Sequence, residues 1–375
     1  MKKTLATLLC LSTLLSAGCS AKVPPVTDPI VTTEATEPPK PGAEIFTDEL
    51  KAKLDGILEQ NKYEGIVSLT CDGEIVYQWV KGTNDLGEPL TVESPMFIAS
   101  TSKQFCAAAI LMLREQGKLS LEDPVTKYFP EYTIGEGITL HHLLSMQSGI
   151  PRDPLPLMEN PELYTDNSRE ENLAAMCQWT FEQPLNFTPG TTMDYSNLNY
   201  NLLSMIVEQV SGQVYNDFIR QNIYEPLGMN HSGFWGEIPD APDWGRGLTY
   251  DKLSAEAHLP GILQGCGDIV TTAGDMELWM TGLRSGKVVS EESYQEMTTT
   301  HTVGYGYGLT PFLRGGWGHG GNLYVYSSVD YINGEYGLNL YMVNNNTSLY
   351  RGDITEKTMS ALLKTVFEAA DAAAG

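Results

Sequence analysis

The sequence predicts an α+β protein in which one antiparallel sheet, built from both ends of the chain, is flanked by helices. Three observations lead to this prediction. Strand patterns occur early, helical patterns fill the middle as an inserted and mostly helical region, and strand patterns return late. With 375 residues, the chain is long enough for one large domain or two small ones with an ample core.

The first predicted elements are a helix and a hairpin. Residues 47–61 carry their leucines and an isoleucine on one stripe, as expected for an amphipathic helix. Residues 65–71 and 74–82 are predicted strands, and they flank Asp72-Gly73, a dipeptide typical of two-residue hairpin turns.

The middle of the chain, about residues 120–260, is predicted to be mostly helical with long loops. Residues 197–212 and 214–229 carry helical patterns, and each pattern ends near a glycine. Residues 149–192 contain many Pro, Asn and Asp residues. They are predicted to form a long loop, of the kind that usually shapes a site.

Strand patterns return near the C-terminal end, at residues 305–313, 322–332 and 336–344. Asn333-Gly334 is predicted as the second hairpin turn. A last helix is expected at about residues 354–370. Together with the two early strands, these three would complete the antiparallel sheet.

The N-terminal residues 1–18 predict a secretion signal. They begin with two lysines, continue with an apolar run too short for a comfortable membrane span, and end in small residues. The letters AGC at Cys19 resemble a bacterial lipobox, in which Cys19 would be lipidated and become the new N-terminus. Ser16 stands where that pattern usually has Leu, so plain secretion with cleavage nearby is the alternative.

Residues 19–45 are rich in Pro, Thr and Glu and lack apolar periodicity, which predicts an extended, flexible tether. Behind a lipid anchor, such a tether would hold a soluble domain off the outer face of a bacterial membrane, toward the cell wall. We expect that domain at residues 46–372, with its helical insert at about 110–260.

Composition disfavours several classes of function. The net charge is −24 and no large basic patch is present, so nucleic acid is an unexpected partner. No CxxC spacing occurs, so a zinc site is not expected. The adjacent His141 and His142 point to different helix faces and are expected as a cap or core contact rather than as metal ligands.

Four cysteines follow the predicted signal and lipobox: Cys71, Cys106, Cys177 and Cys266. Cys106 lies within an apolar helical run and is expected as a small core residue. A disulfide among the four stays open at this point.

A serine and a lysine stand one helical turn apart in the stretch IASTSKQF. Ser100 and Lys103 form an S-x-x-K motif at the start of the apolar helix, and positions i and i+3 share a helix face. Burial would lower the pKa of the lysine from about 10.4, so that it could handle a proton beside the serine. The motif also arises by chance about once in a chain of this length, and a lysine in a first turn can snorkel to water.

Other familiar catalytic motifs are absent from the sequence, which contains neither G-x-S-x-G nor H-E-x-x-H. The stretch MFIASTSKQFCAAAILMLREQGKLSLEDPVTKYFPEY, followed by ITLHHLLSMQSGIP, resembles the β-lactamase-related serine hydrolases. These include class C β-lactamases, DD-carboxypeptidases, D-aminopeptidases and related esterases. The resemblance covers roughly residues 46–370 and implies a serine β-lactamase/DD-peptidase-like fold.

In that family, S-x-x-K, Y-x-N, and K-T-G or H-x-G line one cleft. Y-x-N occurs twice in this chain, beginning at Tyr195 and at Tyr331. The second copy ends in the predicted hairpin turn. The first follows FTPGTTMD and lies just before a helix, so the resemblance assigns Tyr195 and Asn197.

H-x-G also occurs twice, beginning at His231 and at His319. The resemblance implies only a connecting loop at the first copy. The second follows GGWG and leads into a strand, which is the family's edge-strand position. We therefore assign His319 and Gly321, where a glycine lets a substrate backbone approach closely.

The resemblance implies roles for these residues. Ser100 attacks a carbonyl carbon, and Lys103 and Tyr195 together take its proton and later return one to the leaving group. Which of the two is the base stays open. The backbone N–H groups of Ser100 and Asn322 would form an oxyanion hole.

The remaining implied roles concern binding. Asn197 would orient Lys103 and contact the substrate amide. His319 would steer the substrate electrostatically and support the region of Tyr195. The implied reaction is acyl transfer to water through a covalent seryl intermediate, and no metal or organic cofactor is expected.

The substrate is predicted from smaller differences. Class C β-lactamases carry K-T-G where this chain has His319, which favours a cell-wall-facing D-amino-acid peptidase or penicillin-binding hydrolase. A broad esterase or amidase and a class C-like β-lactamase are alternatives, and a lipoprotein that binds wall peptides without turnover is a non-enzymatic one. The expected binding partner is a peptidoglycan-derived peptide, a β-lactam, or a small ester or amide.

Overall fold

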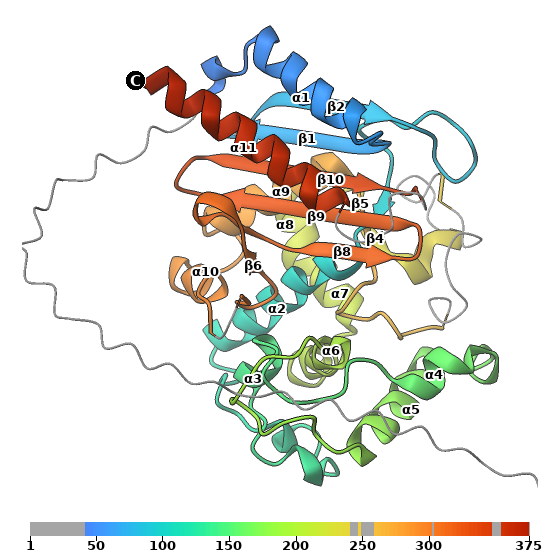
Figure 1. Cartoon of the computed structure of the whole chain (residues 1–375). Coiled ribbons are helices and arrows are strands. Elements are labelled where there is room, and N and C mark those ends of the chain that lie inside the picture. The colour runs from blue at the N-terminus through green and yellow to red at the C-terminus, as the bar shows by residue number, and fades with distance from the viewer. Residues whose placement is uncertain (1–41, 241–246, 249–258, 302–303, 347–353, 375) are drawn as a thin grey trace, which may run out of the picture. The chain divides into compact units, whose positions relative to one another are not determined.

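The computed structural model describes residues 42–240, 247–248, 259–301, 304–346 and 354–374. Its central feature is an antiparallel sheet with the strand order β2-β1-β10-β9-β7-β6, and β8 also pairs with β9 (Figure 1). These strands are β1 (Gly65–Cys71), β2 (Glu74–Lys81), β6 (Thr310–Pro311), β7 (Trp317–Gly318), β8 (Gly320–Leu323), β9 (Tyr326–Asn333) and β10 (Leu338–Asn344). Because β1 pairs with β10, the predicted sheet from both chain ends is confirmed.

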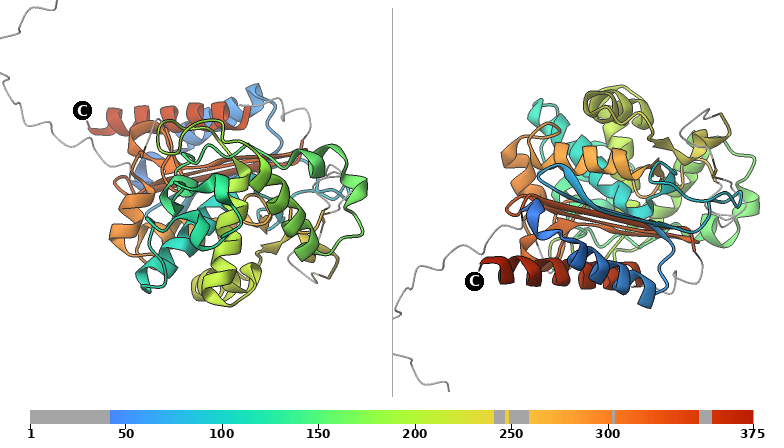
Figure 2. Two further views of the ribbon diagram at one scale, coloured as in Figure 1. Left: turned by 90° about the horizontal axis from the view of Figure 1, so that it is seen from below. Right: turned by 90° about the horizontal axis from the view of Figure 1, so that it is seen from above.

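Helices cover both faces of the sheet. The α1 helix (Asp48–Gln60) and the α11 helix (Ile354–Ala374) lie side by side on one face (Figure 2). A compact apolar core, which includes Leu54, Leu58 and Val366, fills the space between these two helices and the strands. The opposite face carries the helical region, whose larger core surrounds α2 (Lys103–Glu115).

The helical region contains the helices predicted at residues 197–212 and 214–229, and it continues to residue 297, beyond the predicted limit of about 260. Its further helices are α3 (Leu140–Leu144), α4 (Leu155–Glu159), α5 (Arg169–Glu182), α6 (Asn197–Ser211), α7 (Tyr215–Ile219), α8 (Glu225–Leu227), α9 (Ala273–Arg284) and α10 (Glu291–Met297). A small sheet joins β3 (Met96–Phe97), β5 (Ile269–Thr271) and β4 (Gly233–Phe234) in that order. Across the described ranges, no helix has the length and apolar character needed to cross a membrane.

Short helical turns connect these elements. The 3-10 turns are η1 (Ala43–Ile45), η2 (Ala99–Ser102), η3 (Val125–Lys127), η4 (Thr133–Gly135), η5 (Pro161–Leu163), η7 (Trp235–Asp240) and η10 (Leu313–Gly315), and η6 (Arg220–Tyr224) is a π-helical turn. The η2 turn leads directly into α2, so Ser100 and Lys103 sit at the junction of these two elements.

Several local predictions are confirmed. Asp72 and Gly73 have positive φ values of 50° and 83°, as a type I′ hairpin requires. His142 forms a capping box with Thr139 at the start of α3, so its expected role as a cap holds. Cys106 is fully buried among core residues.

The question of a disulfide is answered for the part of the chain that the structure describes. Cys106, Cys177 and Cys266 are buried thiols that form no disulfide there, and Cys71 is buried as well. The predicted signal segment, Cys19 and the tether up to residue 41 lie outside the described residues.

The loop predicted at residues 149–192 is wrong in part, because α4 and the 14-residue helix α5 lie within it. The missed signal is local. Ser168 and Glu171 form a capping box, and Leu173 and Met176 follow on the buried face of α5. The many Pro, Asn and Asp residues surround this helix rather than exclude it.

The predicted late strands are also shorter than expected. The pattern at 322–332 is split into β8 and β9 by a two-residue turn at Tyr324, whose φ is 54°. The pattern at 305–313 contributes only β6 within the described ranges. Asn333 is a paired strand residue opposite Leu338 rather than a turn residue, so the β9–β10 hairpin has a four-residue loop.

A buried carboxyl group ties β9 to the helical region. Asp330 Oδ1 accepts hydrogen bonds from the backbone N–H of His319 at 2.8 Å and from Gln104 Nε2 at 2.7 Å. Gln104 in turn accepts a hydrogen bond from the indole of Trp279 at 3.0 Å. Complete burial raises the pKa of Asp330 to about 7, because the charged form loses its water.

Asp330→Asn is expected to gain stability relative to the wild type as the pH rises. The folded-state pKa of about 7 lies above the unfolded value. The stability that the neutral carboxyl contributes is therefore lost between about pH 4 and pH 7, by up to roughly 4 kcal/mol. The variant lacks the titrating carboxyl, so it does not lose this contribution to stability as the pH rises. Urea unfolding at pH 5, 6, 7 and 8 measures the difference in unfolding free energy.

The exposed residue Asp166 offers a matched control, because Asp166→Asn makes the same chemical change at the surface. The control should keep a nearly constant difference from the wild type. If the difference in unfolding free energy between Asp330→Asn and the wild type were also independent of pH, this would contradict the expected titration of the buried Asp330 carboxyl.

Candidate active site

A cavity of about 240 Å³ lies where separate parts of the chain meet. Ser100, Asn197 and Asn322 line it, together with Arg152 and Asp153. Lys103, Tyr195 and Gly321 lie next to lining residues, and His319 lies next to Tyr195. Residues that are far apart in the sequence are therefore brought into one neighbourhood: Tyr195 is 95 positions and Asn322 is 222 positions from Ser100.

Ser100 lies at the turn between β3 and α2. The residue before it, Ala99, has a φ of 47°, in the left-handed region that is costly for residues other than glycine. Strain of this kind persists where the surroundings enforce it and is concentrated at functional sites. Ser100 is half-buried, whereas Lys103 is completely buried.

The amine of Lys103 has three oxygen neighbours. Nζ lies 2.7 Å from the carbonyl oxygen of Cys266, 2.8 Å from Asn197 Oδ1 and 3.1 Å from Ser100 Oγ. The first two are amide oxygens that can only accept, so they take two N–H bonds. The remaining hydrogen-bonding position of the nitrogen faces the hydroxyl group of Ser100, which can either donate or accept a hydrogen bond.

Asn197 is the first residue of α6, and both ends of its amide are engaged. Its Oδ1 accepts from Lys103, and its Nδ2 donates to Asp153 Oδ1 at 2.7 Å. Asp153 also forms an ion pair with Arg152 at 3.2 Å. The orientation of the amide is therefore fixed by partners on both sides.

The ring of Tyr195 lies close to two cationic side chains. Its centroid is 4.9 Å from Lys103 Nζ and 5.0 Å from Arg152 Cζ, both within the range of cation–π contacts. Its hydroxyl group is buried and has no hydrogen-bond partner among the residues that the structure describes. An unsatisfied buried hydroxyl is costly.

His319 is buried, with only 4% of its surface exposed. Its Nε2 lies 3.0 Å from the hydroxyl of Tyr305, and its Nδ1 lies 2.5 Å from the carbonyl oxygen of Gly320. Burial and the nearby charge of Lys103 lower the pKa of His319 to about 3. The imidazole is therefore neutral near pH 7.

The lowered pKa disfavours a positive charge on His319 near pH 7, so electrostatic steering of the substrate by this ring stays a prediction. The second expected role agrees with this geometry, because the rings of His319 and Tyr195 are 6.1 Å apart. Tyr305 is a third member of this aromatic group, 6.2 Å from Tyr195 between ring centroids.

Gly321 lets β8 pack against the turn that carries Ser100. A Cβ atom at Gly321 would lie 2.2 Å from the carbonyl oxygen of Ile98 and 3.0 Å from the backbone nitrogen of Ser100. Any other residue would push β8 away from this turn. The next residue along the strand, Asn322, lines the cavity beside Ser100.

The second copies of the two motifs lie elsewhere. His231 is largely exposed, and its backbone N–H donates to Asp275 at 2.8 Å. Tyr331 and Asn333 are buried in β9, where the Asn333 amide donates to the Tyr331 hydroxyl at 2.9 Å. The turn that was predicted at Asn333, and that set the second Y-x-N copy aside, is not present, but that copy still lies away from Ser100 and Lys103 in a buried strand.

Sequence reasoning missed other parts of this site. The carbonyl of Cys266 holds Lys103, but a backbone group leaves no signal in residue types. Arg152 and Asp153 lie within the long segment that was expected to shape a site, although neither was singled out. Asp330 supports His319 from β9, where it is the one ionisable carboxyl in a strand that is buried throughout.

Comparisons with known proteins agree with this arrangement. A family model described as Beta-lactamase matches residues 50–362. The Bacillus subtilis (strain 168) protein PbpX, which carries a penicillin-binding protein's name, is 30% identical over 279 residues, 72% of this chain and 68% of that protein. Penicillin-binding protein 4* of the same strain is 28% identical, over 69% of this chain and 62% of its own length.

Solved structures show the same fold. The octameric penicillin-binding protein homologue from Pyrococcus abyssi has a TM-score of 0.69 and 28% identity, over 85% of this chain and 78% of that chain. The D-amino acid amidase from Ochrobactrum anthropi SV3 has a TM-score of 0.70 and 22% identity, over 88% of this chain and all of that chain.

The family model covers most of the described domain, and the solved structures share its antiparallel sheet and helical region. This chain belongs to the Beta-lactamase family and is a β-lactamase-related serine hydrolase.

Proposed function

We propose that this hydrolase cleaves D-amino-acid peptides of the bacterial cell wall through an acyl-enzyme on Ser100. The observation that carries the proposal is the position of the buried Lys103 amine, 3.1 Å from Ser100 Oγ. The side-chain oxygen of Asn197 and the carbonyl oxygen of Cys266 hold this amine in place, so its remaining hydrogen-bonding position is left for the serine. The similarity to proteins named as penicillin-binding supports the choice of substrate.

The proposed first step forms a bond between Ser100 Oγ and the substrate carbonyl carbon. The serine proton passes to the pair formed by Lys103 and Tyr195. It then reaches the leaving amine when the scissile bond breaks. The unpartnered hydroxyl of Tyr195 supports its place in this transfer. Water then attacks the ester and restores the serine.

The negative oxygen that develops in this step needs hydrogen-bond donors. We propose the backbone N–H groups of Ser100 and Asn322 for this role. The tight contact at Gly321 supports it, because it brings β8 against the backbone nitrogen of Ser100.

The neutral His319 favours a peptidase over a class C-like β-lactamase. The K-T-G motif of class C enzymes provides a lysine at this position, whereas the imidazole here is buried and uncharged. Hydrolysis of small D-amino-acid amides or esters is a second candidate. It is favoured by the cavity volume of about 240 Å³, since typical ligand pockets measure about 300–1,000 Å³.

We also propose that Cys19 carries a lipid anchor and that residues 19–42 tether the domain at the outer face of a bacterial membrane. The last three residues of the predicted tether, Ala43–Ile45, instead form the η1 turn, and Ile45 is buried in the core. The sequence AGC at the end of the predicted signal supports this location. Hydrolysis of wall peptides by the domain would agree with it.

Intact mass after incubation with a penicillin tests Ser100 directly. The wild-type chain is expected to gain the mass of the drug, and Ser100→Ala is expected to gain none, because it lacks the attacking oxygen. Ser285→Ala, which changes an exposed serine, should react like the wild type.

An adduct that persists in Ser100→Ala would contradict the proposed nucleophile. If the wild type consumes the penicillin without an adduct, the β-lactamase alternative replaces the peptidase. If the drug survives and D-amino-acid amides are hydrolysed, the amidase replaces it. Failure to act on any of these substrates would favour the wall-peptide-binding lipoprotein.

Gly321→Ala should slow formation of the acyl-enzyme by roughly 100-fold, because displacement of reacting groups by about 1 Å costs about that much. Its Cβ would collide with the backbone carbonyl of Ile98. Gly334→Ala is a matched control, since its Cβ would meet no atom within 4 Å. Time-resolved intact mass measures the rate, and equal rates in both variants would contradict the proposed contact.

Cys19→Ala should move the protein from the membrane fraction to the soluble fraction when it is expressed in a bacterium that processes lipoproteins. Fractionation followed by immunoblotting measures the distribution. Retention of the variant in the membrane fraction would count against the lipid anchor.

A further inference from the structure

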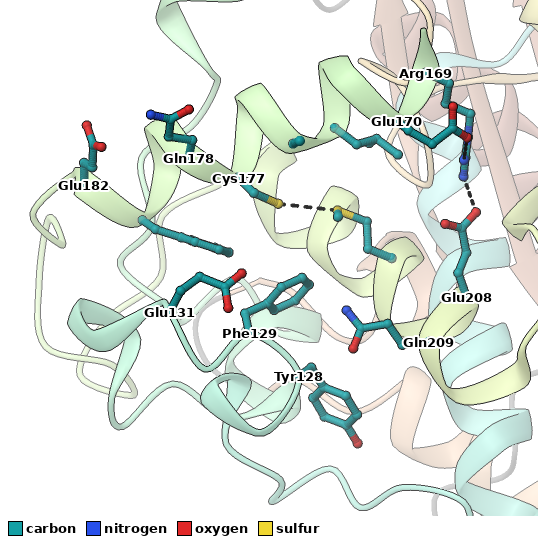
Figure 3. Close-up of a pocket in the computed structure, with 14 residues that line it drawn as sticks. Tyr128, Phe129, Glu131, Arg169, Glu170, Cys177, Gln178, Glu182, Glu208 and Gln209 are labelled. Carbon is teal, nitrogen blue, oxygen red and sulfur yellow. Dashed lines mark hydrogen bonds and ion pairs between the residues drawn. The ribbon is translucent and has the colours of Figure 1, made fainter.

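A cavity of about 650 Å³ lies in the helical region (Figure 3). It is separate from the site at Ser100. The α5 and α6 helices and the segment at residues 128–131 surround it. None of its lining residues also lines the cavity that contains Ser100. Its volume falls within the range of about 300–1,000 Å³ that is typical of pockets for small organic ligands.

Aromatic and apolar groups form the inner surface of this cavity. The rings of Phe129 and Phe181 are 5.5 Å apart, and Phe181 stacks on the ring of Tyr132 at 4.4 Å. Leu173 and Met205 contribute aliphatic surface from α5 and α6. This surface can bury the apolar body of a ligand.

The charged groups around the cavity are mostly acidic. Four carboxylates and one guanidinium line it, so the local charge is 1 − 4 = −3. The guanidinium of Arg169 is already paired with Glu170 at 2.8 Å and with Glu208. Glu131 and Glu182 form no ion pair with any residue that the structure describes.

The carboxylate of Glu131 points into the cavity between Phe129 and Cys177 (Figure 3). The charge of Glu131 also affects the thiol of Cys177. Burial is the larger cause and this charge is the second, and together they raise the pKa of Cys177 to about 12. Glu131 is an exposed residue at the edge of this aromatic cavity. An acid beside aromatic rings is suited to a cation, since the ring faces attract positive charge as well.

Other kinds of ligand agree less well with these residues. The described part of the chain contains no group of three or more His, Cys, Asp or Glu side chains that could hold a metal ion. Thiol chemistry is disfavoured because Cys177 stays protonated near pH 7. An anion would meet the local excess of negative charge. A second copy of this chain is also unsuited, since each copy carries a net charge of −24.

We propose that this cavity binds an organic cation that combines an apolar body with an ammonium group. The apolar body packs against Phe129 and Phe181, and the ammonium group lies at Glu131. Burial of the body supplies most of the affinity, and the carboxylate with the ring faces selects for positive charge.

Binding here does not block the site at Ser100. The α6 helix links the two sites, because Asn197 begins it and Glu208 lies 11 residues further along. At 1.5 Å per residue, these two positions are about 16 Å apart along the helix axis. The cation is therefore bound at a second site, which a substrate at Ser100 leaves free.

Three probes with the same body and different charge test the proposal: 4-phenylbutylammonium, 4-phenylbutanol and 5-phenylpentanoate. Isothermal titration calorimetry of each with the full-length chain gives the dissociation constants. The ammonium compound should bind at least about fivefold more tightly than the alcohol, and the carboxylate should bind most weakly. Equal binding of the ammonium compound and the alcohol would overturn the proposal.

Two variants then locate the binding site. Glu131→Gln keeps the shape of the side chain and should weaken the ammonium compound by about threefold or more, while binding of the alcohol stays unchanged. Ala174→Trp places a large ring at an exposed position of the cavity rim and should abolish binding of both. Glu74→Gln removes an exposed acid far from the cavity and is the matched control.

The outcomes separate the two sites. Loss of binding in Ala174→Trp, with full binding in Ser100→Ala, supports the proposed cavity. Binding that survives Ala174→Trp but is lost when Ser100 is acylated would place the cation at the other site and overturn the proposal. Absence of binding by all three probes would overturn it as well.

Discussion

The burial of one amine constrains the rest of this structure. Lys103 is completely enclosed, and a buried amine without partners would be strongly destabilising. Its partners come from distant parts of the chain: the carbonyl of Cys266, the amide of Asn197 and the hydroxyl of Ser100. The loop before β5, the start of α6 and the turn before α2 must therefore meet at this nitrogen. The same requirement places the serine where its proton can be taken.

The surrounding fold holds these groups in fixed directions. Asp153 fixes the Asn197 amide, and Asp330 holds the strand region of His319 against α2 through Gln104. Buried polar groups of this kind specify one arrangement when they are satisfied. His319 belongs to this support, because its neutral ring packs near Tyr195 instead of presenting a charge to the substrate. In the proposed mechanism, the chemistry is therefore carried by Ser100, Lys103 and Tyr195.

Much of this organisation could be predicted from the sequence. The hairpin at Asp72-Gly73 and the family motifs are local signals, and they gave the sheet from both chain ends and the candidate residues. The α5 helix was missed because Pro, Asn and Asp residues on either side outweighed its capping box at Ser168. The carbonyl of Cys266 and the neutral state of His319 depend on tertiary burial, which single-residue patterns do not contain. The large cavity of α5 and α6 also results from packing, and so no motif indicated it.

The central claim is that Lys103 makes Ser100 the nucleophile, and a crystal structure with an arylboronic acid tests it most directly. Such compounds add reversibly to an activated serine and mimic the tetrahedral intermediate. The account predicts a bond from boron to Ser100 Oγ, with one boron-bound oxygen facing the backbone N–H groups of Ser100 and Asn322. Lys103 Nζ should stay within hydrogen-bond distance of Cys266, as in the unbound chain. Boron bonded to another side chain, or a Lys103 amine turned away from Ser100, would contradict the account.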